Sequence, residues 1–162
     1  LNLYERMALF QLNKLKMPSQ ALTNFEKQAS LIASFSSEHD SLLSKLDIST
    51  ADAYGALGLA KKQKMYAKKA LKTLSRGHED GSIASVEAYQ LLAASYRSLG
   101  KTTKAIEVLE SVYKIQMATP NIVPYKVAET LSELAFACGN IGKIDLKQSK
   151  LEEALSIRKI VY

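Results

Sequence analysis

The stretch "YQLLAASYRSLGKTTKAIEVLESVYKI", residues Tyr89–Ile115, decides the fold. Two runs with apolar residues at helical spacing flank Gly100, and each run contains a small residue, Ala93 in the first and Ala105 in the second. A lone helical hairpin needs only the apolar stripe, whereas a structural repeat also needs small residues at fixed places. The stretch therefore predicts a hairpin of two helices and raises the question of whether the chain holds further copies.

A second copy follows 42 residues later, and its residues match the first position by position. The leucines suit contacts between two helices, the alanines suit a close helix crossing, and the glycines suit a left-handed cap at the end of the first helix. The matched sets are Tyr89, Leu92, Ala93, Tyr96, Gly100 and Lys101 in the first copy, and Leu131, Leu134, Ala135, Cys138, Gly142 and Lys143 in the second.

Two weaker copies precede these. With Ala21 and Ala70 as counterparts of Ala105, and Lys147 as the counterpart downstream, the hairpins recur at spacings of 49, 35 and 42 residues. The units are predicted at roughly residues 1–35, 48–76, 83–118 and 123–162. In the second unit the predicted helices are Ile48–Gln63 and Tyr66–Ser75.

Composition agrees with an all-α protein. The chain has 162 residues, 47% of them hydrophobic, with three prolines and seven glycines, and strand-like alternation is scarce. No apolar run approaches the roughly 18–20 residues that span a bilayer, and no signal peptide is visible. We therefore expect a cytoplasmic protein without a membrane span. Because the first residue is Leu1 and not Met, we expect the chain to be a piece of a longer protein.

The repeated pattern resembles the tetratricopeptide repeat. The fourth unit, with "TLSELAFACGNIGK" followed by "EEALSIR", is similar to the longer repeats of kinesin light chains. That similarity is carried by Leu131, Leu134, Ala135, Gly142, Lys143, Ala154, Leu155, Ile157 and Arg158. The resemblance implies an α-solenoid, a right-handed superhelical array of about four antiparallel hairpins forming a single domain over residues 1–162. Lys147 departs from the pattern, which has a small residue at its place.

The resemblance also implies where a partner binds. In such arrays the first helix of each unit lines a concave groove, and side chains beside each Leu-Ala pair point into it. The predicted groove residues are Phe10, Asn13, Lys14, Lys62, Gln63, Gln90, Ala94, Arg97, Ser98, Ser132, Phe136 and Asn140. Arg6 and Leu59 occupy further matching places. These residues include several cations and no acid, which predicts a basic groove for an acidic or amphipathic segment, or for other repeats of the same chain.

No active site is evident in the sequence, and the prediction is a non-catalytic protein without metal or cofactor. The loop "GHEDG", residues Gly77–Gly81, is interpreted as a turn between repeats because three adjacent residues are a poor metal cage. The single cysteine, Cys138, lies at an interior repeat position and is predicted to pack in the core.

The net charge of +6 favours acidic partners in general, since a positive field attracts anions. Its most basic stretch is "KKQKMYAKK", Lys61–Lys69. Nucleic-acid binding is disfavoured because a platform of stacking aromatics is missing. The main hypothesis is a protein-interaction scaffold or adaptor. The alternative is a structural component of a cytoskeletal or ciliary assembly that contacts a polymer through its basic surface.

Overall fold

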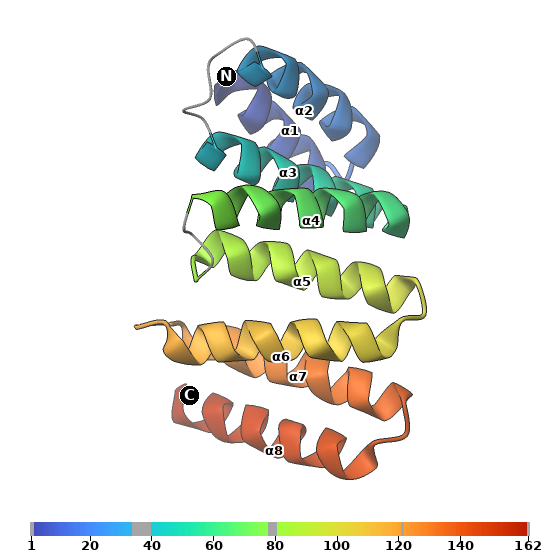
Figure 1. Ribbon diagram of the computed structural model, residues 1–162, viewed down its shortest axis with the longest axis vertical. Helices are drawn as coiled ribbons and strands as arrows, with labels where there is room; N and C mark the ends of the chain where they lie inside the picture. Colours follow the sequence, from blue (N-terminus) through green and yellow to red (C-terminus); the bar gives the residue numbers. More distant parts are fainter. Residues whose placement is uncertain (1, 34–39, 78–80, 121, 162) are drawn as a thin grey trace. The chain divides into compact units, whose positions relative to one another are not determined.

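The computed structural model describes residues 2–33, 40–77, 81–120 and 122–161. These residues form α-helices joined by short connections, and the described ranges contain no strand (Figure 1). The predicted all-α fold of antiparallel hairpins is confirmed. The helices are α1 (Asn2–Asn13), α2 (Pro18–Ala33), α3 (Asp40–Ala56), α4 (Ala60–Arg76), α5 (Ile83–Ser98), α6 (Thr102–Ala118), α7 (Pro124–Asn140) and α8 (Ile144–Val161).

The chain divides into two compact units, Leu1–Ser95 and Tyr96–Tyr162. In the first unit α1 packs on α2, α2 on α3 and α3 on α4; in the second unit α6 packs on α7 and α7 on α8. Helices α2, α3 and α7 therefore each bury one face against the helix before and another against the helix after, as a stacked repeat requires. That a single solenoid runs through residues 1–162 stays a prediction.

The repeat length is marked by four residues at positive φ, Lys16, Gly58, Gly100 and Gly142, each 42 residues after the one before. All four lie just beyond the end of the first helix of a hairpin. After three of them the chain closes with the same bond: the backbone N–H of Leu59, Lys101 or Lys143 donates to the carbonyl five residues earlier, at 2.8–3.0 Å. This is the Schellman type of helix ending, which favours glycine because glycine has no Cβ.

This constant spacing corrects the predicted second unit. The helix predicted over Ile48–Gln63 is wrong at both ends, since α3 covers Asp40–Ala56 and Gly58 ends it before α4 begins at Ala60. The counterpart of Ala105 is therefore Gln63 and not Ala70. The spacings of 49 and 35 residues are likewise wrong, and 42 holds throughout.

Gln63 and Lys147 stand where the other repeats have a small residue, and two glycines account for it. A Cβ added to Gly55 would lie 2.5 Å from the Gln63 Nε2 atom, and one added to Gly139 would lie 3.0 Å from the Lys147 Cδ atom. In the other two hairpins the second helix carries a fully buried alanine, Ala21 or Ala105. The small residue has thus moved to the opposite helix in the second and fourth hairpins, and close packing is kept.

The core is built from apolar residues of neighbouring helices, among them Leu131 and Ala154 of the repeat pattern. Phe25, Ile32 and Leu46 cluster among α1, α2 and α3, while Leu131 and Ala154 join α7 to α8. Each position faces inward in its helix and buries apolar surface, the main source of stability in such stacks. Cys138 is buried and free, which confirms its predicted core role.

Candidate partner-binding faces

The predicted groove residues lie on four helices. The first helices of the hairpins carry Phe10 and Asn13 on α1, Gln90, Ala94, Arg97 and Ser98 on α5, and Ser132, Phe136 and Asn140 on α7, while Lys14 follows the last residue of α1. Lys62 and Gln63, in contrast, lie in the first turn of α4, the second helix of its hairpin, so the helix assignment behind them is wrong. With a repeat of 42 residues, the places of Phe10 and Lys14 fall in α3 on Asp52 and Ala56.

In the first unit the face formed by α1 and α3 combines an exposed aromatic ring with charges of both signs. Phe10 is 56% exposed. Nearby, α1, α3 and the start of α2 enclose a pocket lined by Leu12, Asn13, Lys16, Pro18, Asp52 and Ala56. Partial desolvation raises the pKa of Asp52, and the positive charge of Lys16 acts in the opposite direction. An acid therefore belongs to this face, which the sequence prediction of a purely basic groove did not include.

In the second unit the face of α7 has a similar make-up. Phe136 is 59% exposed, and Ser132 lies one turn earlier on the same side of the helix. The Arg158 Nη2 atom of α8 donates to the Ser132 Oγ atom at 3.4 Å, which brings a guanidinium beside this face.

A second cation reaches α7 from the end of α5. Desolvation raises the pKa of Glu133 most, the Arg97 guanidinium lowers it, and the neighbouring Glu129 raises it. Arg97 and Glu133 thus act on each other electrostatically, so Arg97 belongs to a mixed-charge surface. The sequence could not place Arg158 or Glu133 here, because Arg158 comes from a second helix and Glu133 lies beside the residues matched to the groove.

Phe10 and Phe136 occupy the same place in the repeat, three repeat lengths apart, with Asp52 and Ala94 at the intermediate copies. Both phenylalanines are more than half exposed. The recurrence of phenylalanine at this repeat position is visible in the sequence, whereas its exposure is known only from the structure. Each unit accordingly offers one apolar anchor on the face of a first helix.

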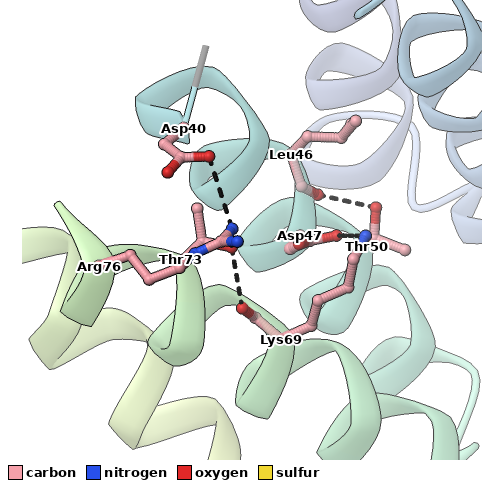
Figure 2. Close-up of polar contacts among 7 residues, drawn as sticks. All are labelled: Asp40, Leu46, Asp47, Thr50, Lys69, Thr73 and Arg76. Carbon is pink, nitrogen blue, oxygen red and sulfur yellow. Dashed lines mark hydrogen bonds and ion pairs between the residues drawn. The ribbon is translucent and has the colours of Figure 1, made fainter. Parts of the chain in front are cut away.

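Two basic side chains of the lysine-rich α4 form ion pairs with acidic side chains of α3 (Figure 2). The Lys69 Nζ atom lies 2.9 Å from the Asp47 Oδ1 atom, and the Arg76 Nη2 atom lies 3.5 Å from the Asp40 Oδ1 atom. Burial raises the pKa of Asp47 most, while the hydrogen bond and the charge of Lys69 lower it. The Asp47 Oδ2 atom is buried without a hydrogen-bond partner among the described residues.

Two tyrosine rings extend this contact. Tyr54 of α3 and Tyr66 of α4 stack with ring centroids 5.3 Å apart. The Lys62 Nζ atom lies 5.0 Å from the centroid of Tyr54, and the Lys69 Nζ atom lies 5.8 Å from that of Tyr66. Lys62, predicted as a groove residue, therefore packs over a ring of its own hairpin.

Three further cations of α4 form an outward stripe. Lys61, Lys68 and Lys72 recur at helical spacing around Met65 and are exposed. Within the described ranges none of these three lysines makes an ion pair. We call Lys61, Met65, Lys68 and Lys72 the α4 stripe.

The candidate metal ligands of the sequence lie in the "GHEDG" loop and at His39. His78, Glu79 and Asp80 of the "GHEDG" loop lie outside the described residues, as does His39. Among the residues that the structure does describe, no group of histidine, cysteine and acidic side chains could hold a metal ion. None of the described helices is both long enough and apolar enough to cross a bilayer.

Comparison with known proteins first gives sequence similarity. No protein-family model matches the chain. A stretch of 101 residues is 35% identical to the RxLR effector protein SFI4 of Phytophthora infestans (strain T30-4). That match covers 60% of this chain and 29% of the effector, so it relates the chain to only a part of that protein.

Solved structures give the fold. BtubC (BKLC) from P. vanneervenii superposes with a TM-score of 0.90 at 17% identity, covering 99% of this chain and 63% of that one. The TPR-like repeats of a putative kinesin light chain from Podosopora anserina give 0.82 at 19% identity, covering 99% and 76%. Rap protein, crystallised with Competence and Sporulation Factor, gives 0.78 at 15% identity, covering 96% and 42%.

These likenesses establish the class of structure. The chain has a tetratricopeptide-type repeat fold, of the kind found in kinesin-light-chain-like repeats, and this sequence-based prediction is confirmed. At identities of 15–19% the structural likeness concerns the fold and not the partner.

Proposed function

We propose that the chain is a protein-interaction module whose first-helix faces bind an amphipathic segment rich in acidic residues. The observation that carries the proposal is the exposed Phe136 of α7, one turn from Ser132, which receives a hydrogen bond from Arg158. An exposed aromatic ring beside guanidinium groups is a typical anchor of protein interfaces, where aromatic residues and arginine dominate the binding energy. The proposed function requires no catalytic group.

The charges on these faces favour a segment that is acidic but not uniformly so. Arg158 and Arg97 attract carboxylates on the partner, while Glu133 and Asp52 favour an occasional basic residue. Apolar side chains on the segment would cover Phe10 or Phe136 and remove their rings from water, which stabilises the complex by about 1.5–3 kcal/mol for each buried ring.

The comparisons support binding of a peptide or protein in general terms. Rap protein, which shares the fold, was crystallised as a complex with Competence and Sporulation Factor. Helical repeats of this type expose an extended surface on one side and bind without chemistry, through shape and side chains. The acidic character of the partner is inferred from the residues of this chain.

A binding assay with two synthetic peptides tests the proposal. The probe is a fluorescein-labelled peptide of Asp, Glu, Leu and Phe, and the control peptide replaces its acids with Lys, so that hydrophobicity is equal. Fluorescence anisotropy should show binding of the acidic peptide only. Phe136→Ala should weaken binding about tenfold, the effect of a typical interface anchor. Arg97→Glu should weaken it further than the matched reversal Lys62→Glu, since Lys62 lies on α4 and packs over the Tyr54 ring of α3. Equal affinities for wild type, F136A and R97E would refute the assignment.

A second candidate function follows from the α4 stripe. Its three exposed lysines would suit a polymer with an acidic surface, as expected of a cytoskeletal or ciliary component. Co-sedimentation with microtubules that is lost on adding salt, and lost in a Lys61→Glu, Lys68→Glu, Lys72→Glu triple variant, would favour it. Co-sedimentation that survives the triple variant would exclude the stripe as the contact.

A further inference from the structure

Helix α4 carries the net positive charge of the chain. It has seven cations and no acid, whereas the other residues comprise fifteen cations and sixteen acids. Within the first compact unit, Leu1–Ser95, the residues outside α4 comprise five cations and nine acids. Because the positive charge is confined to one helix, the field of this unit directs α4 toward an acidic surface.

Contacts with α3 account for some of these cations but not for the α4 stripe. Lys69 and Arg76 form ion pairs with α3, and Lys62 lies over the Tyr54 ring. The three lysines of the stripe are exposed, and in the part of the chain that the structure describes they form no ion pair. A solvated helix face can carry lysines by default, and the other repeats show whether it does so here.

The other second helices do not carry this set of lysines. At the place of Lys68 each of them has an exposed glutamate, and at the place of Lys61 each has an exposed hydroxyl or acidic residue. The counterparts are Glu26, Glu110 and Glu152 for Lys68, and Ser19, Thr103 and Asp145 for Lys61. At the place of Lys72, α6 also has a lysine, Lys114. The packing of the repeat therefore does not require the lysines of the stripe.

The composition of the stripe indicates which kind of acidic surface it fits. It has no arginine, whose planar guanidinium binds carboxylates in a fixed two-pronged geometry, but lysines, whose point charge lies on a flexible stem. Such charges suit a fluid layer of anionic headgroups. Met65 lies between the lysines and is 55% exposed, and an apolar side chain among lysines can enter the boundary between headgroups and acyl chains. We propose that the α4 stripe binds the surface of a membrane that contains anionic lipids.

The structure predicts that this binding is shallow and reversible. Ala67, Ala70 and Leu74 place the apolar side of α4 in the core, so the helix cannot turn that side toward lipid. The stripe extends roughly 16 Å along the helix axis, from Lys61 to Lys72. Each lysine near an anionic surface increases the affinity about fivefold, and added salt weakens the attraction.

Co-sedimentation with lipid vesicles tests the proposal with charge-matched variants. Wild type should bind vesicles of phosphatidylcholine mixed with phosphatidylserine, should not bind phosphatidylcholine alone, and should be released by salt. The double variant Lys61→Glu, Lys68→Glu should bind about thirtyfold more weakly. The fold should tolerate glutamate at position 68, because the other three repeats have it there. The control Lys104→Glu, Lys114→Glu on α6 lowers the net charge equally and should bind like wild type.

A tryptophan in the middle of the stripe reports contact with lipid directly. The chain has no tryptophan of its own, so Met65→Trp introduces a single indole fluorophore. Its emission should shift to shorter wavelength when phosphatidylserine vesicles are added, because the ring then leaves water for the membrane interface. Ser149→Trp, at the same repeat position in α8, should show no shift.

Three results would each overturn the proposal. They are equal vesicle binding by wild type and K61E/K68E, equal emission shifts at positions 65 and 149, and sedimentation of wild type with microtubules but not with phosphatidylserine vesicles. The last result would assign the stripe to an acidic polymer. Peptide binding at Phe136 is measured independently, because that residue lies on α7 and is unchanged in these variants.

Discussion

Hairpins α1–α2 and α3–α4 share one repeat geometry and achieve it with different chemistry. The first places Asn13 on α1 and the buried Ala21 on α2, whereas the second places Gly55 on α3 and the buried Gln63 on α4. Neutral amides connect the first, where the Asn24 Nδ2 atom donates to the Gln11 Oε1 atom at 2.8 Å. Ion pairs connect the second (Figure 2). The repeat thus specifies where a small residue must be available between two helices but leaves open which helix supplies it.

The largest effect on stability is expected where neither facing helix supplies a small residue. Gly55→Ala puts a Cβ 2.5 Å from the Gln63 Nε2 atom, and Gln63 is too buried to move freely. The free energy of unfolding should fall by about 1–3 kcal/mol, as for overpacked cores. Urea denaturation measures it.

A double-mutant cycle and a matched control make this test specific. Gln63→Ala in the G55A background should restore most of the lost stability, because the alanine then repeats the arrangement of Ala21. Asn13→Ala, at the same place in the first hairpin, should change stability by less than about 0.5 kcal/mol since Asn13 is exposed. Additive effects of G55A and Q63A would contradict the proposed exchange.

The residue that closes each hairpin gives the next effect. Gly58 has φ +71° with open space around its Cα, whereas the first hairpin has Lys16 at φ +53°. Gly58→Ala should cost about 1–2 kcal/mol through backbone strain alone. Lys16→Gly should stabilise by up to about 1 kcal/mol, partly offset by the entropy of glycine. Thermal unfolding of both variants checks the opposite signs, and a shift in the same direction would show that the two closures are not equivalent.

The ion pair of the second hairpin predicts a pH dependence that the amide bond of the first lacks. Burial raises the pKa of Asp47 above 3.8 despite Lys69, so the folded state binds its proton more tightly than the unfolded state. Relative to Asp47→Asn, wild type should therefore gain stability as pH falls through the raised pKa, and the gain should level off below about pH 3.8. Asn24→Ala should show no such change relative to wild type. A wild type that loses stability relative to D47N over this range would mean that Lys69 outweighs burial.

The smallest effect on stability is expected at Gly139, the glycine that faces Lys147 in the fourth hairpin. Gly139→Ala places a Cβ 3.0 Å from the Lys147 Cδ atom, but Lys147 is exposed and flexible and can move aside. Alanine also favours a helix over glycine by roughly 1 kcal/mol, which offsets the contact. Stability in urea should change by less than about 0.5 kcal/mol. A loss as large as that of G55A would show that Lys147 is fixed in place.

The same comparison explains how much of the fold the sequence could predict. The hairpins around Gly100 and Gly142 were predictable because both glycines, the Leu-Ala pairs and the 42-residue spacing lie in one linear pattern. The second hairpin was misplaced because Gln63 stands where alanine was expected. Its compensation, Gly55, lies on the facing helix and is adjacent only after folding.

The residues of the candidate site were also predictable only in part from the sequence. The first-helix positions of Phe10, Arg97 and Phe136 follow from the repeat alone. Asp52 was missed because the helix boundary was wrong, and Arg158 was missed because it approaches Ser132 from the second helix. Local periodicity assigns a residue to its helix, whereas the charges of a face depend on contacts between helices.

Chemical-shift mapping with the acidic fluorescein-labelled peptide tests the central claim most directly. Isotope-labelled protein is titrated with the peptide, and the amide signals that move are assigned to helices. We predict the largest shifts on the first-helix faces, around Ser132, Phe136 and Arg97, with small ones along the α4 stripe. Shifts confined to Lys61, Lys68 and Lys72, with α7 unchanged, would contradict a partner-binding role for these faces.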